Sequence, residues 1–177
     1  MRRTGTHGLR LPLAACGEPS AFACRAEESW IYEDGPDELI FTVDHPCQLL
    51  GVGLCAPRQW YNVRLVVSTV DPDNFVETVS VLQTMTQTFT SADATACVCR
   101  LDLPRPEVLQ PGSTYMISAL IKGGESLCCD DCLPQVVERG VTFTFMYHES
   151  PNGTSDERGQ FPELYVRVLE GGALHSA

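Results

Sequence analysis

Cysteine is the residue type whose spacing in this chain most suggests chemistry. Nine cysteines occur among 177 residues, and they include two close pairs, Cys97-x-Cys99 and Cys129-x-x-Cys132. If the two pairs met, their four thiolates could bind zinc tetrahedrally. The C-x-x-C pair alone could be a redox site, but such sites place a thiol at a helix N-terminus. The two aspartates between these thiols also oppose thiolate formation by like charge.

A structural role explains the same cysteines more simply. Cys97 and Cys99 alternate in register with Leu101 and Leu103, as the inward face of a strand does. Buried cysteine behaves as a small hydrophobe. We interpret the segment 128–132 as an exposed cysteine-rich loop, expect no metal or cofactor, and keep the zinc or thiol site as an alternative.

Histidine offers little support for catalysis. A nucleophile needs a histidine or another base held beside it. His7 and His175 lie near the ends of the sequence, His45 lies in a turn, and His148 ends an apolar segment beside Glu149. No G-x-S-x-G elbow, Cys-His signature or phosphate-binding glycine motif accompanies them. We expect His148 and Glu149 to form a solvated strand end, and the chain to be no enzyme.

The charge and apolar content limit the classes of partner. The net charge is −11 at pH 7, from 12 basic and 23 acidic residues. An acidic body repels nucleic-acid phosphates and anionic lipids. No run approaches the roughly 20 apolar residues of a membrane span, and we find no secretory signal. These features predict a protein partner, no nucleic acid, no membrane and a cytoplasmic location.

The elements that would position any site are extended. Segments rich in β-branched and aromatic residues alternate in period two, and each ends in a turn signal such as Asp71-Pro72-Asp73-Asn74. No segment shows a helical period longer than two turns. We predict strands near residues 39–43, 48–54, 61–67, 77–89, 97–103, 115–121, 141–147 and 164–168, with Val136–Val137 as an optional addition.

Some positions carry specific expectations. The two glycines of the segment 48–54 predict a kinked or bulged strand. Val79 and Val81 should share a face in the threonine-rich segment that follows. Trp30 and Trp60 should both pack on the core.

The alternation predicts the fold class. It leaves one wet and one dry face, as in two antiparallel sheets packed face to face. We predict an all-β, jelly-roll-like antiparallel β-sandwich with a single domain over residues 29–170. Residues 1–28 should form a flexible N-terminal extension, and residues 171–177 a C-terminal tail.

Three sequence blocks in order resemble the PHR domain, which is named for the Pam/Highwire group of giant ubiquitin ligases and is also found in BTB-domain proteins. The first block is IFTVD at 40–44 with LGVGL at 50–54. The second is PGSTY at 111–115, leading into Ser118-Ala119 and Lys122-Gly123. The third is GVTFTF at 140–145, then Asn152-Gly153-Thr154 and GQFPEL at 159–164. The resemblance covers about residues 29–168.

The resemblance implies a β-sandwich that recognises a protein partner through loops at one end, as an adaptor or substrate-recognition element in ubiquitin-ligase assemblies. Ligase chemistry is not implied, because no RING ligand set or BTB domain fits in these residues. The loops Gly51–Pro57 and Gly123–Leu133 should join this end. The predicted partner-binding residues are Asn152, Gly153, Thr154, Gly159, Gln160, Pro162 and Glu163.

Two alternative functions remain beside this one. The first is a small-ligand or carbohydrate-binding jelly roll, which would need aromatic side chains exposed in a concave face. The second is the zinc or thiol site built from the two cysteine pairs.

Overall fold

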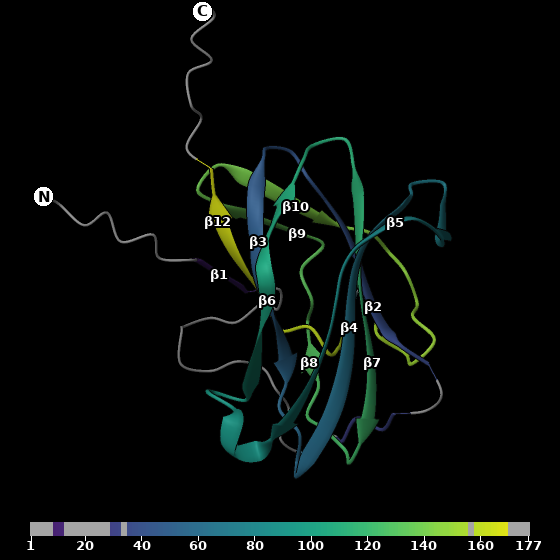
Figure 1. Ribbon diagram of the computed structural model, residues 1–177, viewed down its shortest axis with the longest axis vertical. Coiled ribbons are helices and arrows are strands. Elements are labelled where there is room, and N and C mark those ends of the chain that lie inside the picture. The colour runs from purple at the N-terminus through teal and green to yellow at the C-terminus, as the bar shows by residue number, and fades with distance from the viewer. Residues whose placement is uncertain (1–8, 13–28, 33–34, 156–157, 170–177) are drawn as a thin grey trace, which may run out of the picture.

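The chain folds as an antiparallel β-sandwich (Figure 1). The computed structural model describes residues 9–12, 29–32, 35–155 and 158–169. One sheet has the strand order β1-β12-β3-β6, the other has β5-β4-β7-β2-β10-β9, and β8 pairs with β11. The strands are β1 (Leu9–Pro12), β2 (Asp37–Val43), β3 (Cys47–Cys55), β4 (Trp60–Asp71), β5 (Asn74–Thr90), β6 (Val98–Leu109), β7 (Thr114–Gly123), β8 (Cys129–Asp130), β9 (Gln135–Glu138), β10 (Val141–Phe145), β11 (Arg158–Gly159) and β12 (Glu163–Val168).

The predicted fold class is therefore confirmed. All the strand pairs among these elements are antiparallel. Within the described ranges, the three-residue 3₁₀ helix η1 (Ser91–Asp93) is the only helix, and no helix there could cross a membrane.

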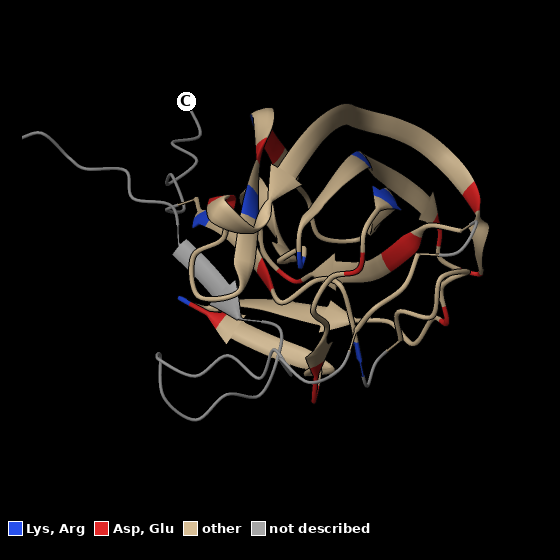
Figure 2. Ribbon diagram, turned by 90° about the horizontal axis from the view of Figure 1, so that it is seen from below, with Lys and Arg blue, Asp and Glu red and all other residues tan. Residues whose placement is uncertain are grey.

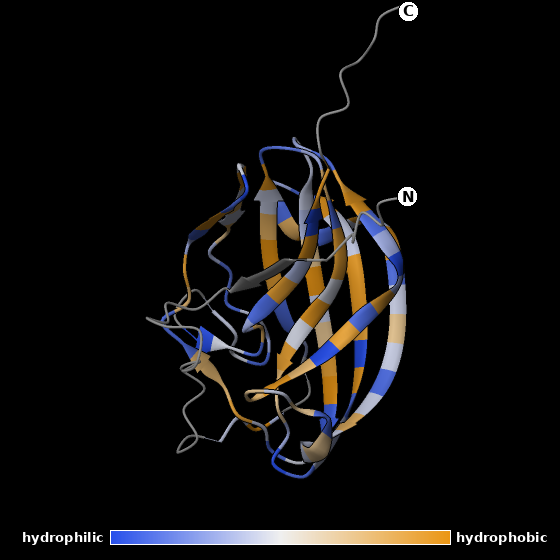
Figure 3. Cartoon of the chain, turned by 90° about the vertical axis from the view of Figure 1, so that its left-hand side faces the viewer, coloured by the Kyte–Doolittle hydropathy of each residue, from blue (hydrophilic) through white to orange (hydrophobic). Residues whose placement is uncertain are grey.

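The core lies between the two larger sheets, where inward side chains alternate with outward polar ones (Figure 3). Phe41 and Tyr61 from the six-stranded sheet and Leu49 and Leu101 from the four-stranded sheet are almost completely buried. Burying a large apolar side chain contributes about 2 kcal/mol, so these inward faces supply the main driving force for the fold.

The predicted irregularity in β3 is present. The register between β3 and β6 shifts between Leu49 and Gly51. A Cβ atom at position 51 would lie 2.7 Å from the carbonyl oxygen of Leu101, so the two backbones approach too closely for a side chain. Glycine permits this approach, as is usual at a bulge.

Part of strand β5 does not bury the side chains that were expected to face inward. Val79 and Val81 are 67% and 58% exposed, so the expectation that they share a buried face is wrong. The register of β5 against β4 shifts at several points in this half of the strand. Moreover, β5 is the edge strand of a six-stranded sheet that faces a four-stranded one, so its outer half has no sheet to pack against.

The two tryptophans lie in different environments. Trp30 is 6% exposed, which confirms its predicted core packing, whereas Trp60 is 51% exposed. Trp60 is outward because Tyr61, its neighbour, begins the inward alternation of β4.

The N-terminal part of the chain contains a strand that composition did not suggest. Leu9–Pro12, inside the predicted flexible extension 1–28, pairs with β12. The rest of that extension before Ser29, and the predicted tail 171–177, lie outside the described residues.

Candidate partner-binding surface

The predicted site residues lie together at one end of the sandwich, but most of them are not on its surface. Thr154, Gly159, Gln160, Pro162 and Glu163 are buried, Asn152 is half-buried, and Gly153 is exposed. The neighbouring segment Gly51–Pro57 is buried throughout. Buried residues at this end can shape a surface without contacting a partner.

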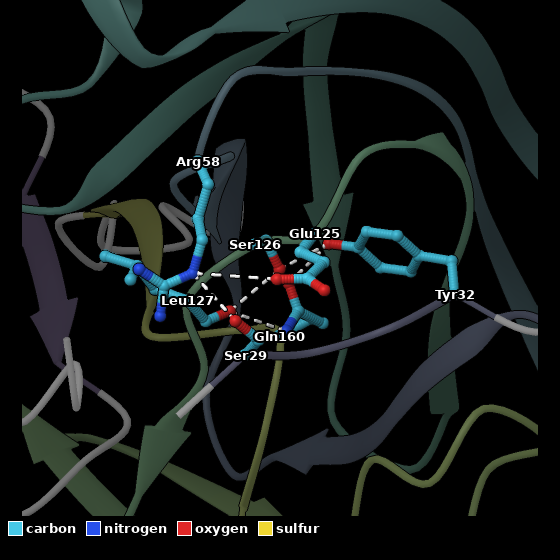
Figure 4. Close-up of polar contacts among 7 residues, drawn as sticks. All are labelled: Ser29, Tyr32, Arg58, Glu125, Ser126, Leu127 and Gln160. Atoms are coloured by element: carbon cyan, nitrogen blue, oxygen red, sulfur yellow. Dashed lines mark hydrogen bonds and ion pairs between the residues drawn. The ribbon is translucent and has the colours of Figure 1, made fainter. Parts of the chain in front are cut away.

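Gln160 is the centre of a buried polar network (Figure 4). Its Oε1 accepts hydrogen bonds from the Tyr32 hydroxyl at 3.0 Å and from Ser126 Oγ at 3.1 Å, and its Nε2 donates to the Leu127 carbonyl at 2.9 Å. Its backbone N–H donates to Thr154 Oγ1 at 3.2 Å. Burial raises the pKa of Tyr32 well above its ordinary value, so the hydroxyl remains a donor. One side chain thus joins segments that are far apart in sequence.

A buried carboxylate fixes the loop that carries Asn152. Asp37, the first residue of β2, accepts hydrogen bonds from Thr154 Oγ1 at 2.7 Å and from Asn152 Nδ2 at 2.9 Å. Burial raises the pKa of Asp37 to about 6, although these hydrogen bonds act in the opposite direction. A charged group buried in this way depends on its hydrogen-bond donors.

Segment 29–32 is held on the domain by the loop between β7 and β8. The backbone groups of Trp30 and Ser126 bond reciprocally at 2.9 and 3.1 Å. Arg58 Nε donates to Ser29 Oγ at 2.8 Å and lies 4.0 Å from a Glu125 carboxylate oxygen (Figure 4). The segment therefore has a fixed position above the Gln160 network.

The exposed part of this end is a shallow depression beside Trp30. The Arg158 guanidinium lies 4.8 Å from the Trp30 ring centre, and Ile31 is 63% exposed. The depression has a volume of about 380 Å³, and we call its lining the Trp30 surface; it consists of Ser29, Trp30, Ile31, Pro151, Asn152, Gly153 and Arg158. Only Asn152 and Gly153 of the predicted site residues belong to it.

The cysteines are arranged differently from the predicted zinc set. Cys99 is buried as expected, but Cys97 is exposed, with a φ of 66° in the turn before β6. Cys129 and Cys132 instead pack against Cys55. Across the ranges that the structure describes, no three His, Cys, Asp or Glu side chains are placed to hold a metal ion. The segment 128–132 is also not an exposed loop, because Cys128 and Cys129 are buried.

His148 is not a solvated strand end. Its Nε2 lies 2.8 Å from Glu38 Oε2, and its ring meets Phe75 edge-on at 6.3 Å. Both members of the His148–Glu38 pair are largely covered, and they line a narrow cavity of about 40 Å³ that Cys132 and Phe161 also border. The sequence could not show this pairing, because 110 residues separate the two partners.

The order of the three sequence blocks, the sandwich and the position of the third block at one end together indicate a family. The family model of the PHR domain matches residues 22–167. The chain belongs to the PHR domain family. It matches no curated protein. The matched range of the PHR domain includes the whole Trp30 surface and the Gln160 network.

Sequence reasoning missed several residues of this PHR domain surface. Arg158, Ile31 and Asp37 are not among the predicted site residues, and for Trp30 the sequence favours core packing over the role of an exposed anchor. An arginine beside the GQFPEL block was the one available signal for Arg158. Nothing in the sequence joined Asp37 to Asn152 and Thr154, because more than a hundred residues lie between them.

Proposed function

We propose that this PHR domain is a non-enzymatic module that binds a protein partner through the Trp30 surface. The observation that carries the proposal is a depression with Ile31 and Arg158 exposed at its edge, above a satisfied buried network centred on Gln160. Interface energy concentrates in aromatic and arginine side chains that are covered on binding. Because hydrogen bonds hold the surface, binding orders few side chains and loses little entropy.

The chemistry of the Trp30 surface favours an apolar group on the partner. Ile31 and Pro151 are exposed and apolar, and Arg158, whose guanidinium lies over the Trp30 ring, lines the depression beside them. The net charge of −11 would steer a partner that is basic elsewhere. Figure 2 shows acidic residues on several loops and Lys and Arg residues dispersed among them, which supports a protein rather than a nucleic-acid partner.

The wider context of the module rests on its family. We assign it as an adaptor or substrate-recognition element in ubiquitin-ligase assemblies, because the family is named for a group of giant ubiquitin ligases. We assign it to the cytoplasm, where thiols stay reduced. Thiols such as Cys47 and Cys99, both buried in the core, support this location.

The test compares one surface variant with one matched control. I31E places a charge on the exposed Ile31 of the Trp30 surface, and V76E does the same on the 88% exposed Val76 of β5. Tagged wild type, I31E and V76E are expressed in cells, and co-purified proteins are quantified by mass spectrometry. Partners specific to the wild type should fall at least about tenfold in I31E, equivalent to about 1.4 kcal/mol, and persist in V76E.

The structure also determines which variants are informative. Replacing the whole loop Asn152–Glu163 would remove Gln160 and its buried partners, so lost binding would then report unfolding. Ile31 is exposed, so I31E should keep the thermal midpoint of the wild type. Equal recovery of the same partners by I31E and the wild type would refute the proposed surface.

A further inference from the structure

Three thiols gather beside β11, the strand that carries Arg158 of the Trp30 surface. Cys55 at the end of β3 and Cys129 on β8 are buried, and Cys132 packs against them. Cys129 Sγ lies 3.1 Å from the Gly159 carbonyl oxygen, and Cys55 Sγ lies 3.8 Å from it. Cysteine thiols held in contact in a reducing compartment are candidates for reversible oxidation.

The backbone brings two of these thiols together. Asp131, in the middle of Cys129-x-x-Cys132, has a φ of 55°, which is in the left-handed region. This conformation costs an ordinary residue about 1 kcal/mol and reverses the chain within a single residue. It allows the Cys132 thiol to hydrogen-bond to Cys129. Aspartate adopts this conformation more readily than most residues, so the sequence permits the turn.

The two thiols of this pair are not equivalent. Cys129 is 1% exposed, whereas Cys132 is half-buried and can be reached from solvent. Hydrogen bonds from Cys132 and then Cys55 lower the pKa of Cys129, while the bond to Cys129 and burial raise the pKa of Cys132. The accessible thiol is thus the one that an oxidant meets, and the inner thiol is the one that is readily ionised.

The pair is connected to the Trp30 surface through the backbone. Strand β8 pairs with β11 in the register Asp130 to Arg158 and Cys129 to Gly159. Arg158 in turn covers the Trp30 ring. Cys129 is therefore one residue away from the strand partner of a residue that lines the depression.

We propose that Cys129 and Cys132 form a reversible disulfide by exchange with small-molecule disulfides such as oxidised glutathione. Cys132 gives its thiol proton to the Cys129 thiolate across their hydrogen bond as its sulfur attacks one sulfur of the oxidant. The S–S bond of the oxidant breaks, and the glutathione thiolate that leaves takes this proton from Cys129. The Cys129 thiolate then attacks the Cys132 sulfur of the mixed disulfide and releases the second glutathione. Two protein thiols lose two electrons, and one glutathione disulfide becomes two glutathione thiols.

The test is oxidation of the intact protein in glutathione buffers. After equilibration with oxidised glutathione, remaining thiols are blocked and the protein is digested with trypsin. The tryptic peptide 123–139 contains Cys128, Cys129 and Cys132. It should carry a single blocking group, on Cys128, and dithiothreitol added before the blocking step should give the peptide with three blocking groups.

Serine variants establish which cysteines react and in what order. C128S should retain the disulfide. C129S should stop at a glutathione adduct on Cys132, because the resolving thiol is gone, and C132S should gain no adduct on the buried Cys129. An adduct on Cys129 in C132S would contradict the order of attack.

Three outcomes would overturn the proposal, and two of them are read in the wild type. The first is a reduced peptide 123–139 in excess oxidised glutathione. The second is loss of the internal disulfide in C128S, and the third is a cross-link between this peptide and the peptide that contains Cys55. Because the first and third outcomes are read on the wild-type chain, a variant that fails to fold does not affect them. They are also independent of whether the Trp30 surface binds a partner.

Discussion

Replacing Asp37 with asparagine should change how the stability of the domain depends on pH. The Asp37 carboxylate is fully buried and accepts hydrogen bonds from Asn152 and Thr154. Burial raises its pKa to about 6 from 3.8. Between these two values the folded state binds a proton that the unfolded state does not, so stability rises as the pH falls. D37N removes this proton-binding group.

The size of the effect follows from the two pKa values. Proton linkage with a folded pKa of about 6 and an unfolded pKa of 3.8 adds about 1.4 kcal/mol to the free energy of unfolding between pH 7 and pH 5. The assay is urea denaturation at pH 7, 6 and 5. The wild type should gain about 1.4 kcal/mol more than D37N over this range, because the two proteins share every other ionisable group.

The control is D73N, which neutralises an exposed aspartate in the turn between β4 and β5. D73N should follow the pH dependence of the wild type. If D37N and the wild type gain the same stability between pH 7 and pH 5, then Asp37 binds the same number of protons in the folded and the unfolded protein over this range. Burial would then not be what controls the pKa of Asp37.

Three further substitutions test the packing around the site, each by urea denaturation at pH 7. Q160A should lose about 3 kcal/mol, because it leaves several buried polar groups without their partner. The free energy of unfolding of G53A should fall by about 2 kcal/mol, since its Cβ would collide with side chains of β12 and β6. In the control G140A the added Cβ meets no atom within 4 Å, so the free energy of unfolding should fall by only about 1 kcal/mol, because the position has a positive φ. Y61F should lose about 1.5 kcal/mol with the hydrogen bond from its hydroxyl to a buried carbonyl, and Y147F, at an exposed position, should change little. Equal losses within either matched pair, or an unchanged Q160A, would contradict this account.

Period-two alternation predicted most of the fold because it reports which side chains face inward. Tyr61 and Leu65 in β4 and Leu101 in β6 follow it without exception. The alternation failed to predict burial in the outer half of β5, at the edge of the wider sheet, where no strand of the other sheet lies opposite. Val79 and Val81 have the right spacing, but alternation carries no information on whether another sheet lies opposite.

Alternation was also misleading where a turn interrupts it. Cys97 is two residues before Cys99 and would share its face in a continuous strand. However, Ala96 and Cys97 both have positive φ, and the strand begins at Val98. The short strand β1 was missed for a different reason. Four residues are too few to establish a period, and their partner β12 lies some 150 residues further along the chain.

The site shows a related limit of sequence reasoning, and it bears on how this end of the domain works. Turn chemistry and the family blocks selected residues that do lie together at one end of the sandwich, because glycine and proline indicate where strands stop. They could not separate exposed residues from supporting ones, since Gln160 and Thr154 owe their burial to Tyr32, Ser126 and Asp37, which are distant in sequence. A surface that is formed by segment 29–32 and by Arg158 but held from below by Gln160 should therefore respond to substitutions at residues that no partner contacts.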